Sequence, residues 1–361
     1  MADLFIFSAE YTYRKYRGIM KKLRSPLLLV LAAFIWGAAF SAQSIGTEFL
    51  GPFSFNGIRF IIGALVLLPV AILIDMSSRK KNSSMLSGSD IESTTKKYLK
   101  KHPDRTDVSL EELICFRKHQ TVKAGIICGC VLFIASNLQQ YGITYVTPGQ
   151  AGFITALYVI LVPIFAVIAG KRGSAFTWIC AVLAVIGMYF LCLSDSEDTI
   201  NLFGNISVFG LFEMNSRYFG YIIEFLCAIG FTFHIIVIDK FSPGLNGVKI
   251  SCIQFFTAGI LSFIFMIITE DITFSDIVSC ILPLLYTGVF SSGIAYTLQI
   301  VGQKNTPPTI ASLLMSLESV FSALTGWMFL HIKMSAGEII GCIIVFTAII
   351  ISQLPFAQPK E

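Results

Sequence analysis

The sequence predicts an all-α polytopic membrane protein of ten transmembrane helices, arranged as two inverted five-helix repeats with both chain termini in the cytoplasm. The first observation behind this is composition: of 361 residues, 55% are apolar and 13% are charged, which is about half the charge of an average soluble domain. The second is a series of apolar stretches of bilayer length, and the third is a concentration of basic residues in alternate loops. The composition excludes a disordered chain and disfavours a soluble enzyme, and the net charge of +4 does not indicate a nucleic-acid partner.

Ten apolar stretches are long enough to cross a hydrocarbon core as helices, at a rise of about 1.5 Å per residue. They lack the apolar–polar alternation of barrel strands, and backbone groups in lipid must be paired within the segment, so helices are expected. Pro26 and Pro52 begin the first two, where the first helical turn tolerates proline. The predicted spans are 26–44, 52–74, 124–143, 150–169, 174–193, 219–238, 250–269, 280–301, 309–330 and 336–353.

Lysine and arginine set the predicted orientation. Of the 26 basic residues, all except Arg59, Arg217 and Lys333 fall before the first span, after the last, or in the loops that share a side with these ends. Because positively charged loops stay in the cytoplasm, both termini are expected there. An even number of spans agrees with this, and the chain is expected to be a multi-pass protein of the plasma membrane.

The two halves of the chain repeat each other in three registers, one of which aligns Gly37-Ala38-Ala39-Phe40 with Gly230-Phe231-Thr232-Phe233. With a shift of 195 residues, Ile58-Arg59-Phe60 aligns with Ile253-Gln254-Phe255. Five spans per half is an odd number, so the second copy enters the membrane in the opposite sense, which is typical of secondary transporters with a midplane substrate site. With a shift of 160 residues, seven identities align without gaps, namely Ala135, Leu138, Gln139, Gly142, Pro148, Ala151 and Leu157 with Ala295, Leu298, Gln299, Gly302, Pro308, Ala311 and Leu317.

These repeats define the predicted domains. The two repeats hold five spans each and are joined by a long extracytoplasmic loop, and a polar, basic cytoplasmic insertion interrupts the first. The segments are a basic N-terminal stretch 1–25, the first repeat 26–193 with its insertion 76–119, the loop 194–218, the second repeat 219–353 and a tail 354–361.

Three segments together resemble a known family. They are 31–40 (LAAFIWGAAF), Arg59-Phe60 in the second span, and 313–320 (LLMSLESV) in the ninth. In this order, with ten spans in a 5+5 repeat, the sequence resembles EamA-domain transporters of the drug/metabolite transporter superfamily. The resemblance implies a secondary transporter, more often an exporter, of small metabolites such as amino acids or related polar or amphipathic compounds, working by alternating access.

Glu318 and Arg59 are the ionisable residues that the spans hold deepest, and such residues usually face the bundle interior. Glu318 lies near the midplane of the ninth span, where a carboxyl could carry a proton and couple transport to a proton gradient, or could serve a helix kink structurally. Arg59 could bind a carboxylate or phosphate of a substrate or cap helix carbonyls. Their repeat mates are Tyr158 and Gln254, so the charges are not symmetric.

Several polar and aromatic residues are further candidates. Ser292, Tyr296 and Gln299 share one face of an α-helix, and we expect that face to line the cavity. Side-chain amides in spans bind substrates or neighbouring helices, and large rings contact a substrate or fill the core. His234 could titrate near neutral pH and assist proton coupling, or be a satisfied core residue. The expected substrate-binding set is Trp36, Arg59, Gln139, Tyr158, Ser292, Tyr296, Gln299 and Glu318, with Glu318 and His234 as proton-coupling candidates.

Two other classes of function are open to a membrane protein of this size. An intramembrane enzyme would need a metal motif, an enclosed nucleophilic serine or deep paired aspartates, and the sequence has none of these patterns. A membrane scaffold or receptor could act through the 76–119 loop. The nine cysteines include no CxxC pair, so neither a metal site nor a cofactor is expected. The expected partners are a small-molecule substrate and the lipid bilayer.

Overall fold

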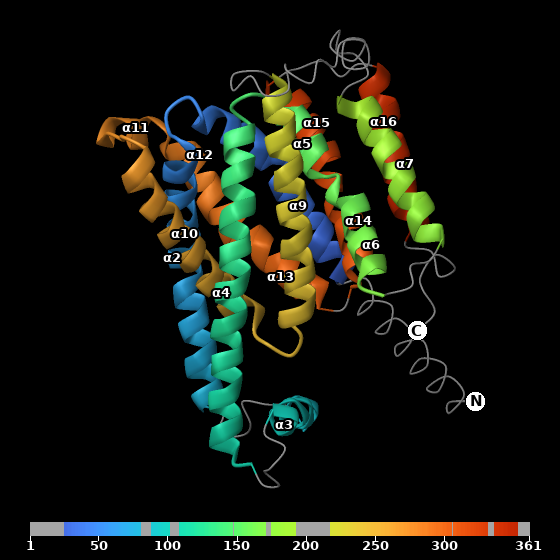
Figure 1. Ribbon diagram of the computed structural model, residues 1–361. Coiled ribbons are helices and arrows are strands. Elements are labelled where there is room, and N and C mark those ends of the chain that lie inside the picture. Colours follow the sequence, from blue (N-terminus) through green and yellow to red (C-terminus); the bar gives the residue numbers. More distant parts are fainter. Residues whose placement is uncertain are drawn as a thin grey trace, which may run out of the picture.

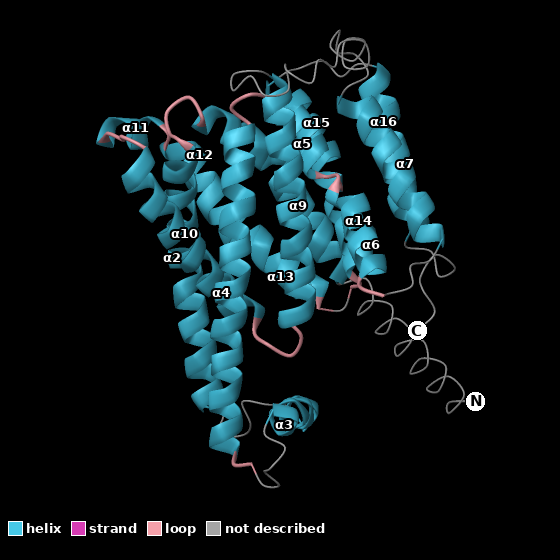
Figure 2. Ribbon diagram, in the orientation of Figure 1, coloured by secondary structure: helices cyan, strands magenta, loops and turns pink. Residues whose placement is uncertain are grey.

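The computed structural model describes residues 25–80, 88–101, 108–146, 148–170, 175–192, 217–304, 306–330 and 336–352. Within these ranges every regular element is helical and no strand occurs, as Figure 2 shows. The predicted N-terminal stretch, most of the loop 194–218 and the C-terminal tail lie outside the described residues.

The helices follow one another with short turns. An N-terminal helix, Ser25–Gly46, precedes the elements labelled in Figure 1. These elements are α2 (Pro52–Lys80), α3 (Gly88–Lys101), α4 (Leu110–Gly142), α5 (Pro148–Thr155), α6 (Tyr158–Ile168), α7 (Ala175–Cys192), α9 (Arg217–Phe241), α10 (Gly247–Thr269), α11 (Phe274–Ser279), α12 (Ile281–Leu285), the π-helix η2 (Tyr286–Tyr296), α13 (Thr297–Gln303), α14 (Pro308–Met315), α15 (Leu317–Leu330) and α16 (Ala336–Ser352).

Eight helical segments of the described chain are long and apolar enough to cross a membrane. The predicted fifth and tenth spans correspond to α7 and α16, whose apolar stretches, Ala175–Gly187 and Ile339–Ile351, are shorter. Large apolar side chains cover the outside, including Ile168 and Ile268, each 74% exposed. This surface is the inverse of a soluble protein's and suits a hydrocarbon solvent.

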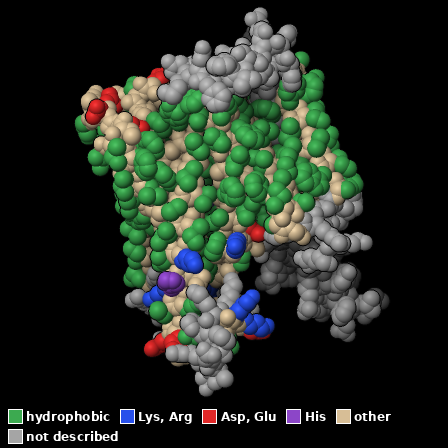
Figure 3. All heavy atoms as spheres, viewed as in Figure 1, with side chains coloured by type: hydrophobic (Ala, Val, Ile, Leu, Met, Phe, Trp, Pro, Cys, Tyr) green, Lys and Arg blue, Asp and Glu red, His purple; other side chains and the backbone are tan. Residues whose placement is uncertain are grey.

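Charged groups lie at the two ends of the bundle. Figure 3 shows apolar side chains along its flank, acidic side chains near α11, and basic side chains toward α3 and the start of α4. We call these the α11 end and the α3 end. At the α11 end, Thr273 and Asp276 form a capping box that starts α11. At the α3 end, Ser109 and Glu112 form another that starts α4.

The α4 capping box explains a difference from the predicted boundaries. The third span was expected to begin at residue 124, but the helix begins at Leu110. Its first turns extend beyond the apolar part and support α3, where Tyr98 packs edge-on against Phe116 with ring centroids 5.4 Å apart. Within 76–119, therefore, the described residues are mainly helical.

Small residues let the helices approach closely, as expected where lipid offers little drive for association. A Cβ added to Gly129 of α4 would lie 2.6 Å from Cβ of Thr257 in α10. One added to Gly37 of the N-terminal helix would lie 2.6 Å from Cβ of Phe321 and 2.7 Å from the carbonyl oxygen of Glu318 in α15. Helices α2 and α10 lie side by side, as do α7 and α16 (Figure 1).

Candidate functional site

Two of the membrane-spanning segments are broken near mid-length. The fourth is interrupted at Ala156 and Leu157, between α5 and α6, and the ninth at Ser316, between α14 and α15. Ala156 and Ser316 are 160 residues apart, so the breaks occur at matching positions of the repeat register. Each break starts a new half-helix inside the bundle, with Tyr158 as the first residue of α6 and Glu318 in the first turn of α15.

Tyr158 and Glu318 contact each other across the bundle. The Tyr158 hydroxyl donates a hydrogen bond of 2.8 Å to Oε1 of Glu318, and both residues are buried. They are also equivalent in the 160-residue register, so residues at matched positions meet. Phe60 and Phe255 do the same in the 195-residue register, with stacked rings 5.8 Å apart. Among the described residues, no lysine or arginine pairs with the Glu318 carboxyl.

Arg59 brings a positive charge to the same region from α2. Its Nη1 donates to Oε1 of Gln43 at 2.9 Å, and its Cζ lies 4.9 Å from the ring centroid of Phe60 and 5.7 Å from that of Phe55. The side chain is only 2% exposed, and Nε has no hydrogen-bond partner. No carboxylate of the described residues pairs with it. A buried cation without an anionic partner is costly, which marks Arg59 as a group that a ligand can complete.

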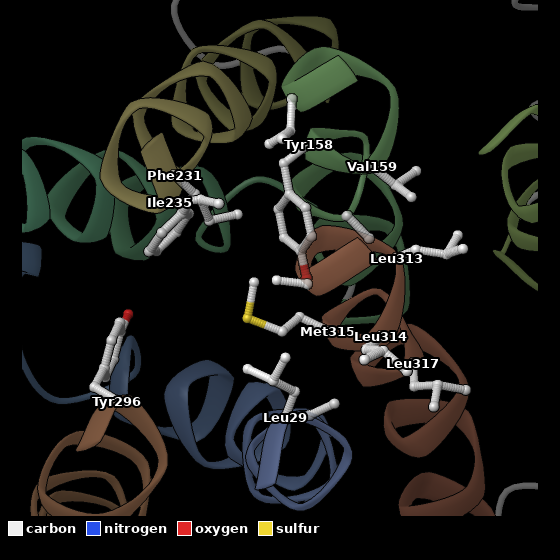
Figure 4. Packing of buried hydrophobic residues seen from close by; sticks show 14 of the residues in the cluster. Leu29, Tyr158, Val159, Phe231, Ile235, Tyr296, Leu313, Leu314, Met315 and Leu317 are labelled. Carbon is white, nitrogen blue, oxygen red and sulfur yellow. The ribbon is translucent and has the colours of Figure 1, made fainter. Parts of the chain in front are cut away.

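A central cavity joins these side chains. In Figure 4, Tyr158 and Tyr296 face each other across a space that Phe231, Ile235 and Met315 border. The volume of the cavity is about 30 Å³. Ordinary ligand pockets measure several hundred Å³, so this cavity is contracted. Its lining residues are Trp36, Phe40, Gln43, Arg59, Gln139, Thr155, Tyr158, Phe231, Ile235, Ser291, Tyr296, Gln299, Met315 and Glu318.

Most of the candidates named from sequence meet at this cavity. Those that line it are Trp36, Arg59, Gln139, Tyr158, Tyr296, Gln299 and Glu318. Ser292 does not; it packs against α2, where a Cβ on Gly63 would lie 2.8 Å from its own Cβ. Its neighbour Ser291 lines the cavity instead.

The π-helix explains why Ser291 rather than Ser292 lines the cavity. Tyr286–Tyr296 is wound with i→i+5 hydrogen bonds, so each turn holds more residues than the α-helix assumed from sequence. The facing residue therefore shifts by one position from Ser292 to Ser291. The Ser291 carbonyl accepts a hydrogen bond of 3.3 Å from Nε1 of Trp36, and the Trp36 ring packs edge-on against Tyr296 at 4.8 Å.

His234 lies behind the cavity wall. Its ring contacts Tyr296 with centroids 5.8 Å apart, and Nε2 lies 3.3 Å from Oε1 of Gln254. It is fully buried and does not line the cavity. The structure thus gives His234 indirect contact with the site, through Tyr296.

Sequence reasoning missed seven lining residues, namely Phe40, Gln43, Thr155, Phe231, Ile235, Ser291 and Met315. The apolar ones carry no pattern that separates them from core residues. Gln43 was detectable, because a buried arginine in one span needs a polar partner in a neighbour. Thr155 links the cavity to a buried carboxyl, since its hydroxyl accepts from Nε2 of Gln139 at 3.3 Å and lies 3.1 Å from Oε2 of Glu224.

A second, larger hollow lies on the flank of the bundle. It measures about 600 Å³ and its lining is mainly apolar. Its walls come from α2, α4 and α10 and include Phe53, Phe133, Asn137, Phe265 and Glu270. None of the candidate site residues named from sequence lines it.

Comparison with known proteins agrees with this architecture. The chain matches the EamA-like transporter family over residues 23–89, 99–193 and 218–353. An uncharacterized transporter of Archaeoglobus fulgidus is 27% identical over 353 residues, which cover 97% of this chain and 93% of the relative. An uncharacterized transporter of Clostridium kluyveri is 21% identical over 322 residues, which cover 87% and 89% of the respective chains.

A solved crystal structure shares the fold. It superposes with a TM-score of 0.63 at 17% sequence identity, and the match covers 91% of this chain and 96% of that one. The family match spans most of the chain and includes both halves of the bundle. The chain therefore belongs to the EamA-like transporter family and is a multi-pass membrane transporter.

Proposed function

We propose that this protein is a secondary transporter that moves amino acids or related amphoteric metabolites by alternating access, with the central cavity as its substrate site. The observation that carries the proposal is the pair of buried charged groups without ionic partners. Arg59 and Glu318 line the same cavity, and neither has an oppositely charged partner among the described residues. A zwitterion would offer a carboxylate to Arg59 and an ammonium group to Glu318.

The walls of the cavity favour a solute with an apolar or aromatic side chain. Trp36, Phe231, Tyr296 and Met315 provide ring faces and flexible apolar surface. Gln139 and Gln299 supply amide groups at matched positions, and Oε1 of Gln299 has no partner. A few oriented polar groups in a mainly apolar pocket are what small-molecule recognition requires.

Alternating access is supported by the arrangement of matched helices. In the proposed topology, ten spans form two inverted repeats, 26–193 and 219–353, and the α3 end faces the cytoplasm. Matched residues contact each other near the centre, and two spans break beside the cavity, features expected of inverted-repeat transporters. The contracted cavity represents an occluded state, in which a solute enters only after one end opens.

The resemblance to this family favours export from the cytoplasm across the plasma membrane, and we propose that direction. A metabolite profile of cells with and without the protein tests it. An exporter should deplete its substrate inside the cells and enrich it in the medium. Accumulation inside the cells would contradict export.

Reconstitution tests the substrate class. Purified protein in lipid vesicles is given a panel of labelled solutes of similar size: zwitterionic amino acids, the corresponding monocarboxylates without an amino group, and the corresponding amines without a carboxylate. We expect uptake of one or more zwitterions, and slower uptake of both single-charge analogues. Transport of the carboxylates and amines at the rate of the zwitterions would overturn the proposal.

Proton coupling through Glu318 is part of the proposal and has its own test. With a pH gradient imposed on the vesicles, Glu318→Gln should abolish the gradient-driven component of transport. Glu224→Gln is the matched control, because Glu224 is also a buried carboxyl but does not itself line the cavity. If Glu318→Gln keeps full pH-dependent transport, Glu318 does not couple protons.

A further inference from the structure

The hollow on the flank of the bundle, called the flank hollow below, is separate from the proposed substrate site. Its volume of about 600 Å³ falls within the range of ordinary ligand pockets. The start of α2 and the last turns of α4 and α10 form it, at the α11 end. It shares no lining residue with the central cavity, so it can hold a molecule of its own.

Three phenyl rings, one from each of these helices, form an apolar wall of the flank hollow. Phe53 of α2 stacks on Phe265 of α10 with ring centroids 5.3 Å apart and on Phe133 of α4 at 6.3 Å, and the rings of Phe133 and Phe265 lie 5.3 Å apart. Ile134 and Phe265 in the lining are 54% and 42% exposed. The hollow therefore opens outward, on the apolar surface that suits a hydrocarbon solvent.

The flank hollow has the depth of one leaflet of a bilayer. Along α4 its lining runs from Phe133 to Tyr141, which is about 12 Å at the rise of an α-helix, and half of a hydrocarbon core is about 15 Å. Tyr141 packs edge-on against Tyr145 at the end of α4 with ring centroids 5.5 Å apart, and tyrosine is typical of the headgroup level. The hollow thus matches a lipid tail that runs from the headgroups toward the midplane.

Glu270 adds a carboxylate at the headgroup level of the flank hollow. Its Oε1 accepts a hydrogen bond of 2.9 Å from the N–H of Phe53, and its Oε2 accepts from the N–H of Ser54 at 2.8 Å and from the Ser54 hydroxyl. A carboxylate has about four acceptor positions, so Oε1 can accept from a further donor. Asp271 follows Glu270, and Asp276 caps α11 at the same end. These acids favour a cationic headgroup and disfavour an anionic one.

We propose that the flank hollow binds a phospholipid whose headgroup carries a primary ammonium group, such as phosphatidylethanolamine. One lipid tail lies against the wall of Phe53, Phe133 and Phe265, and the ammonium group donates to Glu270. The apolar wall accepts any lipid tail, so the carboxylate sets the headgroup preference. The lipid belongs to the leaflet at the α11 end, which is the outer leaflet in the proposed topology.

Lipid titration of the purified full-length protein tests the headgroup preference. Phosphatidylethanolamine, phosphatidylcholine and phosphatidylglycerol with identical tails are added singly, and the bound lipid is counted by native mass spectrometry. An ion pair near water changes an affinity by about two- to fivefold, so phosphatidylethanolamine should bind tighter than phosphatidylglycerol by that factor. Phosphatidylcholine, whose nitrogen has no N–H to donate, should also bind more weakly than phosphatidylethanolamine. Failure of either difference would overturn the proposal.

Two neighbouring acids separate a contact with Glu270 from the general charge of this end. Glu270→Gln should remove the preference and leave similar affinities for the three lipids, because the contacts of the tail remain. Asp271→Asn is the matched control, since Asp271 is exposed and does not line the flank hollow, and it should keep the preference. A preference that survives Glu270→Gln, or that Asp271→Asn removes equally, would overturn the proposal.

A phosphatidylethanolamine with a photoreactive group in its tail tests where the tail lies, and this test decides the site even if Glu270→Gln does not fold. Irradiation should label 133–141 and Phe265 more strongly than Ile343 of α16, which is 60% exposed outside the hollow. Ile134→Trp fills the hollow and should lower the labelling of Phe265 several-fold. Ile126→Trp is the matched control, because Ile126 is 45% exposed on α4 but does not line the hollow. Equal labelling of the whole flank, or an unchanged pattern in Ile134→Trp, would overturn the site.

None of these readouts needs transport, so the lipid site and the proposed function fail separately. A protein that binds lipid as expected but moves no zwitterion would overturn the proposed substrate class alone. A protein that moves zwitterions but shows no headgroup preference would overturn the lipid site alone.

Discussion

At Gly37 the N-terminal helix packs closely against the helix that carries Glu318. A Cβ added there would lie 2.6 Å from Cβ of Phe321, 2.7 Å from the carbonyl oxygen of Glu318 and 2.8 Å from the backbone nitrogen of Ser322. Ordinary contacts of a Cβ begin at 3.4 Å. Gly37→Ala therefore requires the two helices to separate by roughly 0.5 to 1 Å, and overpacking of this kind costs about 1–3 kcal/mol.

The carbonyl oxygen of Glu318 and the nitrogen of Ser322 belong to the backbone and cannot rotate away as a side chain could. The two helices must therefore move apart. We expect Gly37→Ala to lower the melting temperature of the purified protein by several degrees, measured by the loss of monodisperse protein on heating. Because Glu318 moves with its carbonyl, the transport rate should fall as well.

Gly149→Ala is the matched control for this substitution. Gly149 is also in a membrane helix, but no atom lies within 4 Å of a Cβ added to it. It should melt at or slightly above the temperature of the unmodified protein, because alanine favours a helix over glycine. If Gly37→Ala melts together with Gly149→Ala, the close packing of the N-terminal helix on α15 is wrong.

Three further predictions follow from single contacts. Tyr158→Phe removes the hydroxyl that donates to Glu318, at a cost of about 1–3 kcal/mol, so vesicle transport should slow by about tenfold; an unchanged rate would dismiss this bond. Arg59→Lys keeps the charge but loses the planar fork, so the KM for carboxylate-bearing solutes should rise by about tenfold, whereas a KM equal to the unmodified protein's would exclude bidentate binding. The backbone and hydroxyl of Thr273 donate to Asp276 and lower the pKa of that carboxyl from 3.8. The ionised Asp276 carboxylate therefore stabilises the start of α11 fully above pH 3.8, and this stabilisation is lost as the pH falls through the lower pKa of the folded state. Amide exchange at the start of α11 should accordingly rise only in acid. A rise at neutral pH would contradict the cap.

The composition and the length of the apolar stretches were enough to predict a helical membrane protein, because bilayer thickness dictates the length of an apolar helix. They could not predict where helices break. Ala156 and Ser316 are neither glycine nor proline, so the sequence gives no local signal of a break at these two residues, and the breaks are seen only in the structure. Likewise, Leu110 starts α4 because Ser109 and Glu112 cap it, a local signal that hydropathy alone does not contain.

The charged residues of the site could be predicted from the sequence, but the apolar residues that give the cavity its shape could not. Arg59 and Glu318 stood out because charged residues are rare in spans, and both line the cavity. The spacing of an α-helix predicts that Ser292 lines the cavity, but this segment is a π-helix, whose turns hold more residues. Phe231, Ile235 and Met315 look like core residues in sequence, and only the packing of α9 against the broken helices brings them to the cavity.

The most direct test of the proposed mechanism is a structure of the transporter with the solute identified by the metabolite profile. We expect the solute to lie in the central cavity, with its carboxylate on Arg59 and its ammonium group within hydrogen-bond reach of Glu318. A solute bound in the hollow on the flank of the bundle, beside Phe53 and Phe133, would contradict the proposed site. So would a solute in the central cavity that contacts neither Arg59 nor Glu318.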